Sequence, residues 1–238
     1  VVEYMLLDAA KTDPFWGVRK EAAIAFGKLK PKIQFEDYVW INDEHDSRVK
    51  RALLGVLKNY KGDVGVSNFL QSVIRADTNY YVIADAFKTL VAVDSSSAKQ
   101  YVEGLLNTES HNDTIRKSAL VYFSTVKTDK NYDRLQKLGS YGGMTWESRP
   151  SAIKELGAYV KTRPETVELL IDFLNDQDRF VRREAVKQLG KHGNRSHFAV
   201  LDSVKESDPV LAVNILSAKK AIRLRGTKKD TKKEKNID

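Results

Sequence analysis

Apolar positions recur along the chain with helical spacing. In each unit a β-branched or small residue is followed four positions later by Ala or Leu, and eight positions later by a large apolar residue. Spacing of zero, four and eight places these residues along one face of a helix. We therefore predict a half-buried helix at each first position, which we call the anchor. The anchors are Val18, Val49, Val82, Ile115, Ser148, Val181 and, with a weaker match, Leu211.

Polar residues and glycines mark the ends of these helices. A carboxylate shortly before an anchor accepts hydrogen bonds from the free N–H groups of the first turn. A glycine shortly after the last apolar position is typical of a helix C-terminus. Carboxylates of this kind are Asp13, Asp46, Asp113, Asp178 and Asp208, and glycines follow at Gly27, Gly157, Gly190 and Gly193.

A second apolar segment lies between consecutive anchors, at 35–41, 66–74, 98–106, 132–138, 164–174 and 198–204. Each segment is long enough for a short helix, so the repeating unit is a helix pair. Segment 2–10 is predicted to be a second helix whose partner lies outside this sequence. Sustained alternation with a period of two is absent, so no strand is predicted.

A helix pair of this kind cannot bury its apolar face alone, so neighbouring pairs must stack. The predicted fold is all-α: a right-handed α-solenoid, or superhelix, of about seven helix pairs with a concave surface. We predict one repeat domain over residues 1–226, without an internal boundary, followed by a Lys-rich disordered tail at 227–238.

The charge changes this picture little. The chain of 238 residues has a net charge of +8, but residues 216–238 hold nine Lys or Arg against three Asp or Glu. The rest of the chain is nearly neutral, which disfavours a nucleic-acid-binding face, since such a face needs clustered basic residues. Binding of nucleic acid through the tail stays a weaker hypothesis. No apolar run approaches the length of a membrane span, and we expect a soluble, cytoplasmic protein.

The sequence contains no site for metal, thiol or phosphate chemistry that we can identify. It has no Cys and four His. His192 and His197 stand five residues apart, which does not place them on one helical face. The glycine-rich segment 139–144 lacks the Lys-Ser or Lys-Thr pair of a phosphate-binding loop and is predicted to be a loop within one repeat. We therefore assign no catalytic, cofactor-binding or metal-binding residue to this chain.

The pattern Asp-Pro-x-x-x-Val-Arg-x-Glu-Ala-Ala, followed by a large apolar residue and Gly, resembles HEAT repeats. The resemblance covers nearly the whole chain and is strongest at 13–29 and 176–190. It implies an Asp and an Arg, six residues apart, that form hydrogen bonds along the stack. Asp13 with Arg19 and Asp176 with Arg182 have this spacing, and Glu44 with Lys50 is a weaker version.

Segment 13–23 is also similar to a segment in the C-terminal helical domain of gluzincin zinc aminopeptidases of the membrane-alanyl type, and segment 146–152 is loosely similar. The catalytic motifs His-Glu-x-x-His and Gly-Ala-Met-Glu-Asn of that family are absent. The resemblance therefore implies a noncatalytic domain that shapes access to the active-site cleft and peptide binding. Zinc would belong to the parent enzyme, and the partner would be the N-terminal catalytic domain of the same polypeptide.

A free-standing HEAT-like scaffold that binds a protein partner on its concave face is the alternative hypothesis. Whether the parent protein is an enzyme stays open, because this chain carries no catalytic motif. Under either hypothesis the candidate peptide or partner contacts are Tyr141, Trp146, Arg149, Arg182 and Arg183.

Overall fold

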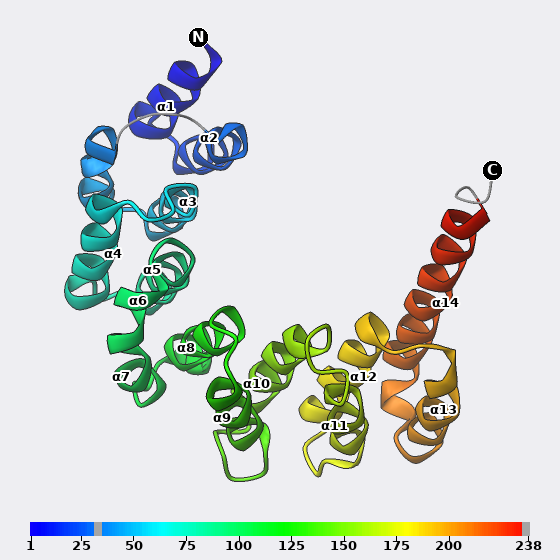
Figure 1. Ribbon diagram of the computed structural model, residues 1–238. Coiled ribbons are helices and arrows are strands. Elements are labelled where there is room, and N and C mark those ends of the chain that lie inside the picture. Colours follow the sequence, from blue (N-terminus) through cyan, green and yellow to red (C-terminus); the bar gives the residue numbers. More distant parts are fainter. Residues whose placement is uncertain (31–34, 235–238) are drawn as a thin grey trace. The chain divides into compact units, whose positions relative to one another are not determined.

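The computed structural model describes residues 1–30 and 35–234, which contain helices and no strand. The chain forms two compact units, Val1–Val126 and Lys127–Asp238 (Figure 1), where the sequence predicts one array over 1–226. Within each unit helix pairs stack side by side, so the predicted all-α solenoid is confirmed.

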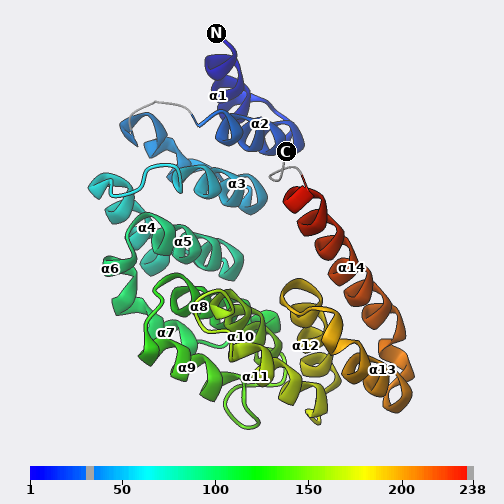
Figure 2. The same cartoon turned by 45° about the vertical axis from the view of Figure 1, so that its right-hand side comes forward.

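In the first unit the anchor helices pack against one another, α2 on α3, α3 on α5, and α5 on α8. They are α2 (Trp16–Leu29), α3 (Ser47–Leu57), α5 (Tyr80–Val93) and α8 (Thr114–Thr125), the last preceded by η3 (His111–Asp113). The partner segments form a second row, visible in Figures 1 and 2. They are α1 (Val2–Thr12), the 3-10 segment η1 (Phe35–Asp43), α4 (Val64–Ala76), α6 (Ser95–Ala98), η2 (Lys99–Tyr101) and α7 (Val102–Leu106).

In the second unit α10 packs on α12, and α12 on α14. These anchor helices are α10 (Arg149–Leu156) with η4 (Gly157–Tyr159), α12 (Arg179–His192), and α14 (Ala212–Glu234) after η7 (Pro209–Leu211). Their partners are α9 (Asp129–Gly139), α11 (Thr166–Asp172) with η5 (Phe173–Asn175), and α13 (Phe198–Ser207) after η6 (Arg195–His197).

Two terminal segments differ from the sequence prediction. The predicted helix at 2–10 is present as α1, but its partner does not lie outside this sequence, because α1 packs against α2 as a helix pair. At the other end α14 continues to Glu234, so helical backbone extends into the segment 227–238 that the sequence predicts to be a disordered tail. Residues 235–238 of that tail lie outside the described residues.

The repeating apolar positions form the core as predicted. All residues four positions after an anchor are at most 7% exposed, as are those eight positions after the first six anchors. In the last repeat Ala218 is buried instead of Lys219. Val18 is an exception among the anchors at 43% exposed, against 0% for Val49. No described anchor helix covers the other side of α2, where an open apolar groove of about 650 Å³ lies beside α1.

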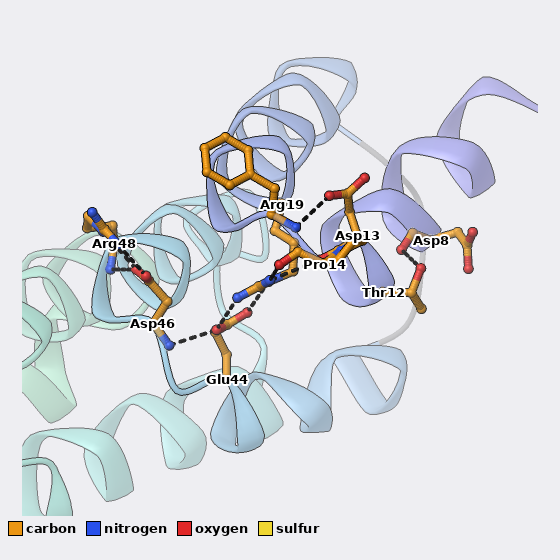
Figure 3. A network of polar contacts seen from close by, with 9 residues as sticks. Asp8, Thr12, Asp13, Pro14, Arg19, Glu44, Asp46 and Arg48 are labelled. Atoms are coloured by element: carbon orange, nitrogen blue, oxygen red, sulfur yellow. Dashed lines mark hydrogen bonds and ion pairs between the residues drawn. The ribbon is translucent and has the colours of Figure 1, made fainter.

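A polar ladder links consecutive anchor helices near their N-terminal ends. The cation one residue after an anchor binds a carboxylate that precedes the next anchor helix. Arg19 contacts Glu44 with two of its nitrogens, at 3.0 and 3.1 Å (Figure 3). The rungs of the ladder are Arg19–Glu44, Lys50–Asp77, Arg149–Asp176 and Arg182–Asp208.

Three of the ladder carboxylates also organise the start of the next anchor helix. Each accepts the backbone N–H two residues later at 2.8 Å, and that later residue caps the helix with its own side chain. The carboxylate and cap pairs are Glu44 with Asp46, Asp77 with Asn79, and Asp176 with Asp178. One carboxylate therefore fixes both the stacking of repeats and the local helix start.

The spacing implied by the HEAT resemblance identifies several ladder residues, but it does not predict which residues form ion pairs with each other. Each predicted carboxylate and cation belong to the same repeat, whereas the rungs join consecutive repeats. Within one repeat Arg19 donates to the backbone carbonyl of Asp13 at 2.9 Å, and Arg182 to that of Asp176 at 2.7 Å. The rung from Arg149 was not predicted, because Gly143 stands where the rule expects an acid.

We predict that Arg149→Met destabilises the chain by about 3 kcal/mol, because removing one partner leaves the Asp176 carboxylate of a largely buried ion pair uncompensated. Arg183→Met is the matched control. Arg183 is exposed on α12 outside the ladder, so this change should stay within about 0.5 kcal/mol of the parent. Urea unfolding followed by circular dichroism measures the free energy of unfolding of both variants. An equal loss of this free energy in the two variants would contradict a stabilising role of the Arg149–Asp176 ion pair.

We also predict that the α3 cap makes stability depend on acid pH. The hydrogen-bonded guanidinium of Arg48 lowers the pKa of Asp46 from 3.8 to about 2. Because the folded-state pKa is lowered, the stabilisation is present above about pH 4 and is lost as the pH falls towards 2.

Asp46→Asn keeps an acceptor for the cap but removes the charge. Its urea midpoint should lie below that of the parent chain at about pH 6, and the gap should close near about pH 2. A gap of the same size at both pH values would contradict the assigned role of the charge.

Candidate partner-binding surface

The second unit presents aromatic side chains where α10 and α12 begin. Trp146, in the turn before α10, is 59% exposed, and its ring centre lies 5.7 Å from that of Phe180 in the first turn of α12. Arg179 and Arg183 place their guanidinium carbons 5.6 and 5.0 Å from the Phe180 ring centre. We call these four residues the aromatic–arginine patch. Cations at such distances from a ring face are attracted to it.

Glycines shape the turn that carries Trp146. Gly142 has a φ of +77°, in the left-handed region that favours glycine. At Gly143 an added Cβ would lie 1.9 Å from the backbone oxygen of Lys137, so only glycine lets the turn approach the end of α9 so closely. The predicted loop at 139–144 is therefore a turn that packs against the end of α9, and this contact fixes its position.

Arg149 fixes the base of this turn. Its side chain is buried, and its Nε donates to the carbonyl oxygens of Gly139 and Ser140, both at 3.0 Å. The same guanidinium binds Asp176 and lies 5.7 Å from the ring centre of Tyr141. Arg149 thus ties the end of α9 to the approach to α12. It was predicted as a partner contact, but its donors are used inside the stack.

The other predicted contacts are either used inside the stack or exposed on the surface. Arg182 is a ladder residue: it binds Asp208 at 2.6 Å and donates to backbone carbonyls at the start of α12. Tyr141 is 77% exposed, and Trp146 and Arg183 are exposed as well. The structure therefore brings Trp146 and Arg183 into the patch and places Tyr141 on the same turn as Trp146.

Sequence reasoning missed two members of the patch, Arg179 and Phe180. Their positions in the repeat could have identified them. Arg179 and Phe180 stand two residues and one residue before the anchor Val181, and Trp146 stands two residues before the anchor Ser148. Residues just before an anchor lie at the exposed start of the helix. When the helices stack, these residues come close to the residues that precede the anchor of the adjacent repeat.

The two patch arginines lack carboxylate partners. Among the side chains that the structure describes, none forms an ion pair with Arg179 or Arg183. Of the two acids adjacent to them in sequence, Asp178 caps α12 by accepting the N–H of Phe180 at 2.8 Å with Oδ1, and Glu184 binds Lys187 at 3.5 Å. Both patch arginines therefore lie beside the rings without an ion-pair partner among the described side chains.

Arginines also lie over aromatic rings in the first unit, but there they are neutralised. Arg48 lies 3.3 Å from the ring centre of Trp16 and binds Asp46, and Arg51 lies 4.8 Å from that of Tyr81 and binds Asp85. These rings are half-buried. Arg223 in the second unit also lies 5.2 Å from a ring centre, that of Phe198, but this ring is half-buried, so the exposed ring of Trp146 marks the patch as the candidate site.

The histidines take structural positions. The Nδ1 atom of His197 accepts the N–H of Asn194 at 3.0 Å in a capping box before α13. Burial lowers the pKa of His192, and nearby positive charges lower it further. Within residues 1–30 and 39–226, no group of three or more His, Asp or Glu side chains could hold a metal ion.

The comparisons with known proteins bear on the second unit. Residues 141–217 match a family model described as HEAT repeats, and this range contains the whole patch. A search of curated proteins finds no match to the chain. Among the described residues, no helix is both long enough and apolar enough to cross a membrane. The chain is thus an α-solenoid of HEAT-like helix pairs, with its similarity to the HEAT family model located at 141–217.

Proposed function

We propose that this chain is a noncatalytic HEAT-like scaffold that binds a protein partner through the aromatic–arginine patch. The observation that carries the proposal is the exposure of Trp146 beside Phe180, with two arginines around them that form no ion pair with a described side chain. Trp and Arg are among the residues that contribute most binding energy at protein interfaces. Stacked helical repeats offer extended surfaces that are used in this way.

The support beneath the patch favours binding. The turn with Trp146 is held by the buried Arg149, and α12 is fixed by its cap Asp178 and by the ladder pair of Asp176. A surface held in place before binding loses little conformational entropy when a partner arrives. Rigid support therefore raises the affinity that a small patch can reach.

The aminopeptidase hypothesis is the second candidate, and one observation favours it. Segment 146–152, which resembles the C-terminal helical domain of gluzincin aminopeptidases, begins with the patch residue Trp146. On this proposal the partner is the N-terminal catalytic domain of the same polypeptide, which would hold the zinc. The coding sequence upstream of Val1 tests it. A reading frame that encodes His-Glu-x-x-His would support the hypothesis, and a frame without that motif would remove it.

Site-specific photo-crosslinking tests the scaffold function. We predict that replacing Tyr141 with p-benzoylphenylalanine in the cell of origin yields a discrete adduct with a protein, because this 77% exposed side chain lies on the turn that carries Trp146. The same replacement at Lys130 is the control, since Lys130 is exposed on α9 in the other row of helices. Irradiation followed by electrophoresis and mass spectrometry measures both.

The expected yield at position 141 is at least about ten times that at position 130, because interface positions are enriched over the rest of the surface. Trp146→Ala should reduce the adduct without unfolding the chain, since the ring is mostly exposed. Equal yields at positions 141 and 130, or no adduct at either, would count against the proposal.

A further inference from the structure

We infer that the aromatic–arginine patch binds a short acidic segment of a protein partner, in extended conformation, with two carboxylates two residues apart and an apolar side chain two residues further on. The inference rests on the proposed function and names the chemistry of the partner. It follows from three features of the patch: its uncompensated charge, the spacing of its arginines and its exposed ring.

The charge of the patch selects an anionic ligand. Arg179 and Arg183 are exposed, and neither forms an ion pair with a described side chain, whereas the arginines over Trp16 and Tyr81 bind Asp46 and Asp85. A guanidinium offers planar donors that match the two oxygens of a carboxylate. Stacking beside Phe180 also limits the motion of both guanidinium groups, so less freedom is lost when they bind.

The spacing of the arginines selects the arrangement of the carboxylates. Arg179 and Arg183 stand four residues apart on α12, which places their Cβ atoms about 5–6 Å from each other. In an extended peptide, residues two apart lie on one face about 7 Å from each other. One extended segment can therefore present a carboxylate to each arginine.

The ring of Trp146 selects the apolar residue. It is 59% exposed and tilted by 35° to Phe180, so the two rings form a shelf rather than a closed core. Covering an exposed ring with an apolar side chain removes apolar surface from water and is favourable. An apolar residue on the same face of the peptide as its carboxylates can reach such a shelf.

A nucleic acid fits the patch less well. Rings and arginines also bind single strands, but such sites follow the backbone with a positively charged groove. The patch offers two free guanidinium groups, and the neighbouring Lys187 is paired with Glu184. A DNA-binding protein typically neutralises about 6–10 phosphates. An acidic peptide is therefore the occupant that the charges favour, and a single strand becomes an outcome of the test.

The test uses the full chain and two fluorescein-labelled peptides, Gly-Asp-Ser-Asp-Ser-Leu-Gly and its amide analogue Gly-Asn-Ser-Asn-Ser-Leu-Gly, with labelled oligothymidine as a third probe. Fluorescence anisotropy at about 50 mM and about 300 mM NaCl measures affinity. The acidic peptide should bind at least about ten times more tightly than the amide analogue, and salt should weaken its binding, because the arginines bind it through charge-assisted hydrogen bonds.

The variants locate the site. The double variant Arg179→Gln with Arg183→Gln should lose at least about ten-fold in affinity for the acidic peptide, because both charges are removed. The matched control, Lys130→Gln with Lys205→Gln, removes two exposed charges of the same unit away from the patch and should leave affinity unchanged. Circular dichroism checks that both variants are folded.

Three results would overturn the inference: equal affinity for the two peptides, an unchanged affinity in the Arg179 and Arg183 double variant, or tighter binding of oligothymidine than of the acidic peptide. The proposed function is judged separately by the crosslink from position 141. A crosslink that persists in the double variant would leave the scaffold function standing and remove the acidic ligand, whereas the loss of crosslink and peptide binding together supports both.

Discussion

The structure depends on the ladder ion pairs that join an anchor helix to the start of the next, at Arg19–Glu44, Lys50–Asp77, Arg149–Asp176 and Arg182–Asp208. The apolar stripes explain why the helices pack, but helices that are shifted along one another would bury a similar area of apolar surface. A partly buried rung such as Arg19–Glu44 is satisfied in only one of them, because the carboxylate must meet both the guanidinium and the N–H of Asp46. The ladder therefore sets the register in which the small residues of neighbouring helices meet, and with it the places where helix starts come together.

The break in the ladder supports this interpretation. Ile83 stands on α5 where other repeats have a cation, and Ser110 stands where the next carboxylate would be. The Ser110 hydroxyl accepts the N–H of Ile115, five residues later, at 3.0 Å, whereas the ladder carboxylates accept the N–H two residues later, so a different local hydrogen bond takes its place here. Cation and acid are missing together at this step. At the next step the cation Arg116 is present and Gly143 replaces the acid, and Arg116 binds Asp113 of its own repeat, so its partly buried charge still has a partner.

The sequence predicted the parts of the fold that depend on local spacing. The anchor columns, the caps Asp46 and Asp178 and the all-α class follow from periodicity and from side chains close in sequence, so they could be read without coordinates. The other three predicted caps, Asp13, Asp113 and Asp208, make no side-chain capping hydrogen bond to α2, α8 or η7. The rung Arg149–Asp176 could not, because Gly143 breaks the spacing rule and the partner lies in the next repeat. The patch was found in part: Trp146 and Arg183 were named, but Phe180 joins Trp146 only when α10 stacks on α12.

The arginines show why composition could not locate the surface. Arg182 and Arg183 are neighbours in sequence with the same charge, yet one binds Asp208 within the stack and the other lies beside Phe180 in solvent. A helix turns by about 100° per residue, so adjacent side chains face different surroundings. What distinguishes Arg183 here is that no described side chain forms an ion pair with it, a property of the stacked repeats rather than of the net charge. A nearly neutral solenoid can therefore still carry a local anion-binding surface.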